Sequence, residues 1–126
     1  MPTPTYDEVV AGDHQNEVSW TYRIAVCSVV VLVVYFALIT WGKYDFCQGW
    51  ANHYAAQAAK LRSDARDPQY SDEEKRELLI AAEWHEIISK KYAVVASQPW
   101  RDYPRAPLIT PQDQRQAISR VDQLSR

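Results

Sequence analysis

The feature that most constrains this chain is an uncharged apolar run over residues 24–41. It reads IAVCSVVVLVVYFALITW and contains no acidic or basic side chain. Counted from Trp20, a helix of this stretch covers about 31 Å at about 1.5 Å per residue, close to the bilayer's hydrocarbon thickness of about 30 Å. Because backbone groups in lipid must bond within their own segment, the valine run should be helical. The sequence therefore predicts one transmembrane helix over residues 19–42.

Aromatic residues flank the apolar run on both sides. Trp20 and Tyr22 stand at one end, and Trp41 and Tyr44 stand at the other. Tryptophan and tyrosine are enriched at membrane interfaces, and the chain has five Trp and eight Tyr against two Phe. These four residues are therefore predicted to lie at the two membrane–water interfaces.

The flanks of the run also indicate a retained anchor and an orientation. Residues 1–18, predicted to be an N-terminal tail, carry four acidic residues and no Lys or Arg. A cleaved signal peptide would begin with a basic region instead. Arg23 alone precedes the run, whereas Lys43 follows it at once and further basic residues come later. The positive-inside rule then places the N-terminus outside and the C-terminal region in the cytoplasm.

Two helices are predicted beyond the run, within residues 43–98. The first is rich in alanine and ends before Pro68, because proline disfavours helix in the residue before it. Ser71 and Glu74 then form the pattern of a capping box, so the second helix should run from Asp72 to about Gln98. Such a short connection predicts an antiparallel hairpin.

Antiparallel counting gives the hairpin a register. Position 53 should lie level with positions 84 and 85, and the second helix should return toward the membrane end of the first. The return places Trp100 near the interface, as a fifth predicted membrane-interface residue.

The second helix carries two apolar faces. One has the alternating three and four spacing of a coiled-coil seam and should pack on the first helix. The other cannot be covered by a two-helix hairpin, so a further partner is expected to cover it. This second face comprises Ile80, Trp84, Ile87 and Val94.

Residues 99–126 are predicted to form an extended strap followed by a short helix. The stretch RDYPRAPLITP has three prolines in eleven residues, which favours an extended chain. Thr110 before Pro111, with Asp113 nearby, indicates a helix start. A short helix is marginal alone, so this one should dock on a partner through its narrow apolar stripe. The predicted docking residues are Ile118, Val121 and Leu124.

The predicted fold class is therefore all-α. A single transmembrane helix continues into an antiparallel extramembrane helical hairpin, then a proline-rich strap and a short C-terminal helix. The segments are 1–18 (tail), 19–42 (transmembrane helix), 43–98 (hairpin) and 99–126 (strap and docking helix).

The chemical candidates are His53, His85 and Glu86, which the predicted register brings to a similar height. Two imidazoles and a carboxylate can hold a metal, but a polar clasp within the hairpin is the favoured interpretation. A third firm ligand is missing, because Cys47 lies about 9 Å along the helix axis from His53. The sequence therefore predicts no metal and no cofactor.

Other sequence features argue against catalysis and nucleic acid. There is no glycine-rich phosphate loop, no Ser/His/Asp ordering and no pair of intramembrane carboxylates. The formal charge of −2 provides no basic surface for phosphate backbones. The chain is therefore predicted not to be an enzyme, with no nucleic-acid partner and no small-molecule substrate.

The pattern CQGWANHYAAQAAKLR followed by AEWHEIISKKYAVVASQPW resembles a module of planctomycete-type small membrane-associated helical-hairpin proteins, a family without an assigned function. The likeness covers roughly residues 45–105. It implies that the two helices and the Pro-Trp stop form one unit. The matching positions are Cys47, His53, His85, Lys91, Tyr92, Pro99 and Trp100.

The sequence thus predicts a non-catalytic accessory or structural subunit of a larger membrane protein complex, respiratory or photosynthetic by analogy. The expected partners are that complex and the lipid bilayer. Two alternatives stay open. One is a metal- or haem-binding single-pass redox protein that uses the hairpin histidines, and the other is a membrane-anchored adaptor for a soluble partner.

Overall fold

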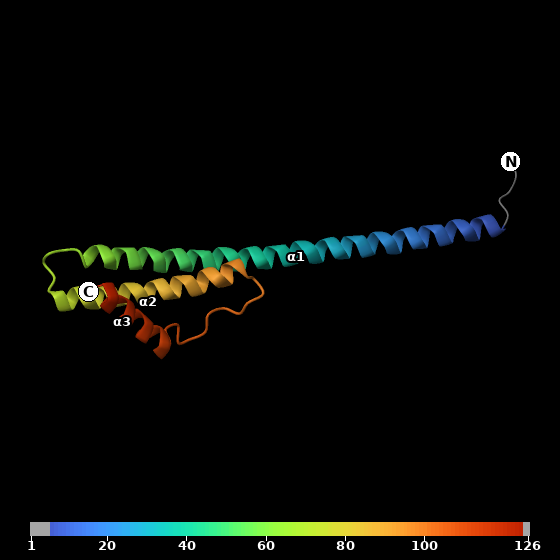
Figure 1. Cartoon of the computed structure of the whole chain (residues 1–126). Helices are drawn as coiled ribbons and strands as arrows, with labels where there is room; N and C mark the ends of the chain where they lie inside the picture. The colour runs from blue at the N-terminus through green and yellow to red at the C-terminus, as the bar shows by residue number, and fades with distance from the viewer. Residues whose placement is uncertain (1–5, 125–126) are drawn as a thin grey trace. The chain divides into compact units, whose positions relative to one another are not determined.

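The computed structural model describes the backbone of residues 6–124 and the side chains of residues 19–124. Figure 1 shows its three helices, α1 (Tyr6–Asp64), α2 (Asp72–Ser97) and α3 (Pro111–Leu124). Residues 6–124 contain no strand, which confirms the all-α prediction for this part of the chain. The chain divides into two units, Met1–Ile39 and Thr40–Arg126, and α1 contributes residues to both.

The first unit consists of the N-terminal part of α1. The helix begins at Tyr6, so it extends into the residues that were predicted to be a tail before the transmembrane helix. No proline lies between Tyr6 and Ile39 to stop the helix earlier. The described part of α1, Ser19–Asp64, is long and apolar enough to cross a membrane, and its most apolar window has 0% of its residues buried within the chain.

The ends of α2 follow from local residues, as predicted. Ser71 Oγ accepts a hydrogen bond from the Glu74 N–H at 3.3 Å, and Glu74 Oε2 accepts one from the Ser71 N–H at 2.7 Å. At the other end, the Gln98 N–H bonds to the carbonyl groups of the preceding turn, and Pro99 follows. The capping box is confirmed, and the helix ends within one residue of the predicted position.

Within the second unit, α2 runs back alongside the C-terminal part of α1 (Figure 1). The helices approach closely because the contact face of α1 carries alanines, Ala51, Ala58 and Ala65, which are all buried. Ser89 Oγ of α2 donates a hydrogen bond to the Ala51 carbonyl at 2.8 Å. Small side chains at seven-residue spacing therefore define the side of α1 on which α2 packs.

The register between α1 and α2 agrees with the predicted one only in part. Position 53 was expected level with 84 and 85, and Tyr54 stacks on His85 at 5.6 Å between ring centroids, close to that expectation. Trp50, however, stacks on Tyr92 at 6.2 Å, whereas the same counting places residue 87 opposite it. Helical winding itself ends where it was predicted, because the N–H groups of residues 65–67 still bond to carbonyl groups of the last α1 turn and Pro68 follows. Near Trp50 the pairing lies roughly one helical turn further along α2 than counting predicts.

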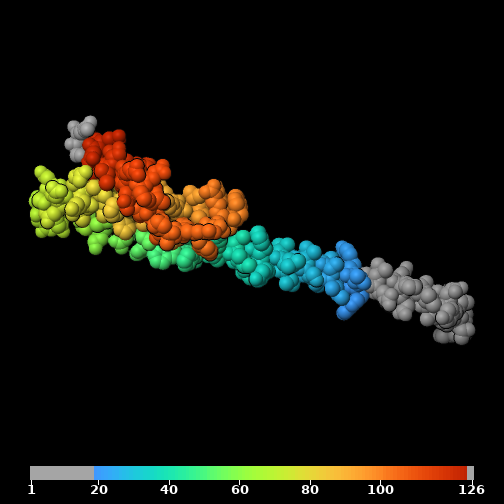
Figure 2. Space-filling view, turned by 90° about the horizontal axis from the view of Figure 1, so that it is seen from below, coloured from blue at the N-terminus to red at the C-terminus, as the bar shows by residue number. Residues whose placement is uncertain are grey.

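The C-terminal helix packs against α2 of the same chain. Figure 2 shows the strap and α3, in orange and red, lying against the rest of the second unit. Ala117 and Val121 are buried, at 0% and 2% exposure. The two helices are antiparallel, as three ion pairs show: Arg76 with Asp122, Glu83 with Arg120, and Lys91 with Asp113.

Candidate functional site

The two histidines that were considered as metal ligands both contact the ring of Tyr54. His53 meets it edge to face at 5.5 Å between centroids, and His85 stacks on it at 5.6 Å. Among the side chains of residues 19–124, no group of three or more His, Cys, Asp or Glu could hold a metal ion. His85 Nδ1 is buried and has no hydrogen-bond partner among the described residues, so the expected clasp is not made by the imidazoles. The histidines instead belong to an aromatic array.

That aromatic array joins α1 and α2, with Tyr54 and Tyr92 half-buried and Trp50 39% exposed. The rings of Trp50, Tyr54 and Tyr92 stack on one another at 5.8 to 6.2 Å between centroids. Beside them, Cys47 is fully buried against Val95, and burial raises the pKa of its thiol. Offset ring stacking adds to apolar burial, so this array is part of the core between the helices.

The polar clasp that joins the three helices centres on Glu83. Glu83 is buried and only 8% exposed. Glu83 accepts a hydrogen bond from Arg62 of α1 at 2.7 Å and another from Arg120 of α3 at 3.3 Å. A buried carboxylate without such partners would be strongly disfavoured, because it loses its hydration. Glu83 therefore ties α2 to both of its neighbours.

Glu86, the third candidate metal ligand, extends the same clasp. It accepts hydrogen bonds from Lys90 at 2.6 Å and from Arg62. Lys90 and then Arg62 are the main causes that lower the pKa of this carboxyl to about 2. Glu86 is therefore a charged partner of basic side chains.

Sequence reasoning does not reveal this clasp, because charged residues on a surface helix most often form a solvated face. The sequence signal for the clasp is the position of Glu83 relative to the apolar residues of α2. Glu83 falls on the helical stripe that includes Ile80 and Ile87, so its carboxylate lies on an apolar face.

Replacing Glu83 tests the clasp. Glu83→Gln is expected to lower the free energy of unfolding of the second unit by about 1.5 kcal/mol, because Arg62 and Arg120 lose charge-assisted hydrogen bonds but can still reach water. Urea titration in detergent micelles, followed by tryptophan fluorescence, measures this change. The matched control is Glu77→Gln on the exposed side of α2. Equal stability of the two variants would show that Glu83 holds nothing together.

A second polar contact fixes the start of α3. Lys91 Nζ donates to Asp113 Oδ2 at 2.6 Å and to the Leu108 carbonyl at 2.8 Å. Asp113 Oδ2 also accepts a hydrogen bond from the Thr110 N–H at 2.8 Å. In return, the Thr110 hydroxyl oxygen accepts a hydrogen bond from the Asp113 N–H and so caps the helix. The predicted helix start at Pro111 is confirmed, and one carboxylate serves both the cap and the contact with α2.

Acid should release this contact. Lys91, followed by Thr110, lowers the pKa of Asp113 to about 2 from its ordinary value of 3.8. A depressed pKa contributes stability above the unfolded value and loses it as pH falls from about 4 through about 2. Urea midpoints compared at about pH 5 and about pH 2.5 should therefore fall less for Asp113→Asn than for the wild type. An unchanged acid dependence in the variant would contradict this role of Asp113.

The predicted partner face is partly covered by the chain itself. Ile87 and Val121 are buried, and α3 packs against α2 over this region, so these two residues are not available to another protein. Ile80 and Trp84 are half-buried. These residues are covered because α3, which is too short to be stable alone, packs its apolar stripe on α2. The predicted contact residues that stay exposed are Val94, Ile118 and Leu124.

The strap begins beside the first residues after the apolar run. Lys43 Nζ donates to the Pro99 carbonyl at 2.9 Å and to the Arg101 carbonyl, and it lies 4.8 Å from the Tyr103 ring centroid. These contacts place the chain around Trp100 next to Lys43, which lies between Trp41 and Tyr44 in the sequence. Contact of these aromatics with a membrane stays a prediction, as it does for Trp20 and Tyr22 in the first unit. All five side chains are exposed.

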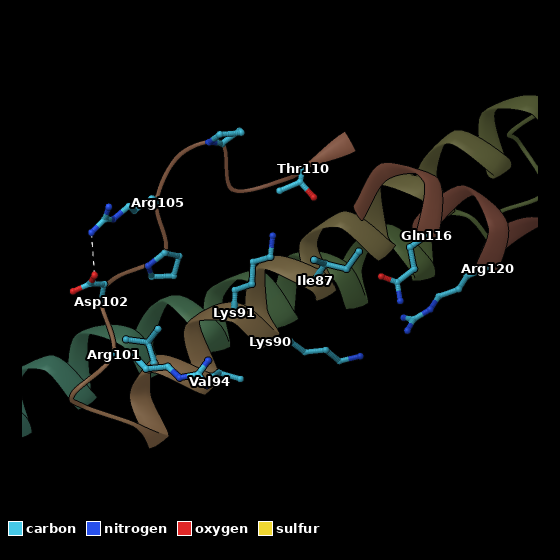
Figure 3. Close-up of a pocket in the computed structure, with 13 residues that line it drawn as sticks. Ile87, Lys90, Lys91, Val94, Arg101, Asp102, Arg105, Thr110, Gln116 and Arg120 are labelled. Atoms are coloured by element: carbon cyan, nitrogen blue, oxygen red, sulfur yellow. Dashed lines mark hydrogen bonds and ion pairs between the residues drawn. The ribbon is translucent and has the colours of Figure 1, made fainter. Parts of the chain in front are cut away.

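A groove lies between α2, the strap and α3 (Figure 3). Its volume is about 650 Å³. Its floor is apolar and includes Ile87, Val94 and Val95 of α2. Five basic side chains and one acidic side chain also line it: Lys90, Lys91, Arg101, Arg105, Arg120 and Asp102. We call this the α2–strap groove.

Comparisons with known proteins leave the family of this chain open. The resemblance to planctomycete-type membrane-associated hairpin proteins therefore stays a prediction. No family model, no curated protein and no solved structure matches the chain.

Proposed function

We propose that the chain is a non-catalytic accessory subunit of a larger membrane protein complex. In this proposal α1 spans the bilayer once, and the second unit forms an extramembrane hairpin with a strap and a docked helix at the membrane surface. The observation that carries the proposal is the apolar surface of α1. Every side chain of residues 19–39 is exposed, for example Val31 at 65%.

Lipid is the environment that suits this surface. Soluble proteins rarely expose a contiguous apolar patch larger than a few hundred Å². The run over residues 24–41 is long enough for its exposed apolar surface to be much larger than that. Its one serine, Ser28, donates its hydroxyl to the Ile24 carbonyl at 2.9 Å. The side-chain hydroxyl therefore has a partner without water, as a position inside a bilayer requires.

An exposed aromatic patch supports the accessory role. Phe46 and Tyr103 meet edge to face at 5.8 Å between centroids, and Phe46 meets Trp50 at 6.2 Å. All three rings keep exposed area, although Trp50 also packs in the core. Aromatic residues are enriched at protein interfaces, where they supply large contact area. This patch lies close to Lys43 and hence near the predicted membrane interface, where a neighbouring subunit of the same membrane could reach it.

The proposed host is a respiratory or photosynthetic complex, by analogy with the small single-span subunits of such assemblies. The proposed orientation keeps the N-terminus outside and the second unit in the cytoplasm. The same aromatic patch could serve a soluble partner, which is the adaptor alternative. The redox alternative gains no support from the observed placement of His53 and His85.

Purification of the tagged full chain in a mild detergent tests the proposal. We expect it to migrate with larger membrane proteins in a complex of constant composition. Phe46→Ser should weaken that association, whereas Gln57→Ser, at an exposed polar position of α1, should not. Migration as a free small protein from its native membrane would contradict the accessory role, and capture of soluble proteins alone would favour the adaptor.

A further inference from the structure

We propose that the α2–strap groove binds the headgroup of an anionic phospholipid. The inference rests on the proposed membrane location, and it adds a ligand class to the second unit. Three observations carry it: basic side chains without firm partners at the rim, an apolar floor, and the attachment of the rim to the first residues after the apolar run.

The basic side chains of the rim are available to an anion. Arg101 is exposed and has no side-chain partner among the described residues. Among the residues that the structure describes, Arg105 pairs only with Asp102, and both side chains are more than 80% exposed, so water screens this pair and weakens it. Lys90, by contrast, is already bonded to Glu86 at 2.6 Å. Guanidinium groups suit phosphate oxygens because they offer paired N–H donors.

The remaining cations of the groove are already held by the fold. Lys91 is bound by Asp113, and Arg120 is bound by the buried Glu83. They therefore shape the groove and add positive potential without giving up their partners. Because these carboxylates belong to the clasp and the cap, the free binding capacity lies on the strap side, at Arg101 and Arg105.

The floor of the groove indicates an amphiphile. Ile87 and Val94 of α2 and Pro104 of the strap line the groove below the charged rim. Val94 keeps 41% exposure, which leaves apolar area for a ligand to cover. A glycerol backbone and the first acyl carbons would cover this area, whereas inorganic phosphate would leave it in water. The combination of cationic rim and apolar floor therefore matches a phospholipid.

The position of the rim favours a lipid over an acidic peptide. The Arg101 carbonyl is held by Lys43, which follows the apolar run by two residues. Trp100, directly before Arg101, is 78% exposed, as expected for a side chain that enters the interface. Arg101 and Arg105 are thereby placed where phosphate groups of a cytoplasmic leaflet would lie, and anionic lipids concentrate in that leaflet.

The test uses the full chain in nanodiscs of phosphatidylcholine mixed with phosphatidylglycerol. Native mass spectrometry counts the lipid molecules that stay bound to the chain after it is released from the nanodisc. The double variant Arg101→Gln/Arg105→Gln is expected to retain phosphatidylglycerol about tenfold less than the wild type. The matched control, Lys60→Gln/Arg66→Gln, removes two exposed charges away from the groove and should retain it as the wild type does.

The outcomes separate this inference from the proposed function. A chain that enters nanodiscs but retains both lipids equally overturns the headgroup site and leaves the membrane anchor standing. An equal loss in both double variants also overturns it, because general charge attraction then explains binding. Displacement of the lipid by inorganic phosphate, or by a soluble polyglutamate peptide, would replace the lipid with a free anion or an acidic partner. A chain that does not enter nanodiscs overturns both proposals.

Discussion

Val31→Arg is expected to lower the stability of membrane insertion by about 3 kcal/mol, which is more than a hundredfold in the insertion equilibrium. Val31 lies in the middle of the apolar run, and its side chain is 65% exposed. An arginine there would lie in hydrocarbon, too far from either interface to place its guanidinium fully in water. Resistance of the membrane-bound chain to alkaline carbonate extraction measures the effect.

Val31→Leu is the matched control for that experiment, since it keeps the apolar character and should insert as well as the wild type. If the arginine variant stayed in the membrane fraction as fully as the leucine variant, α1 would not span the bilayer through this run.

The second large effect is expected at the contact between α1 and α2. Ala58→Leu should lower the free energy of unfolding of the second unit by about 2 kcal/mol, because Ala58 is only 2% exposed and the added methyl groups have no space. The helices would have to separate and uncover the stacked rings of Tyr54 and Tyr92. Urea titration in micelles, followed by tryptophan fluorescence, reports the loss.

The adjacent residue supplies a close control for that substitution. Ala59 is exposed on the other side of the same helical turn, so Ala59→Leu makes the same chemical change and should alter stability by less than about 0.5 kcal/mol. Equal stability of the two leucine variants would mean that α2 does not pack on this side of α1.

The helices and most of their ends were predictable because local residues determine them. Ser71 and Glu74 cap α2 through their own side chains and N–H groups, and Thr110 with Asp113 does the same for α3. Pro99 follows the last residues of α2, where it cannot continue a helix. Such signals act within a few residues and do not depend on tertiary packing.

The packing of the helices on one another could be predicted from the sequence less well than their ends. Counting from the turn places His85 near Tyr54, but it does not predict that Trp50 stacks on Tyr92. Docking of α3 was expected on a partner, but its narrow stripe fits any apolar face of matching width. Nothing in the sequence distinguishes a face on α2 from a face on another protein.

The site residues illustrate the same limit of local patterns. His53 and His85 were conspicuous by residue type, yet their contacts are with aromatic rings. The α2–strap groove draws its lining from three segments, and Arg101, Arg105 and Arg120 come together only after α3 has docked. A charge pattern read along one helix cannot reveal a basic surface assembled from separate segments.

We propose that the chain crosses the membrane once, with the second unit on one side. It is tested most directly by labelling single cysteines in intact cells with a maleimide that cannot cross membranes. In a Cys27→Ala background, where Cys47 is fully buried, Thr3→Cys should react and Ser63→Cys should react only after the cells are opened. The reverse pattern would keep the single span and invert its orientation. Equal reaction of both positions in intact cells would place both ends on the same side and contradict the single membrane-spanning helix.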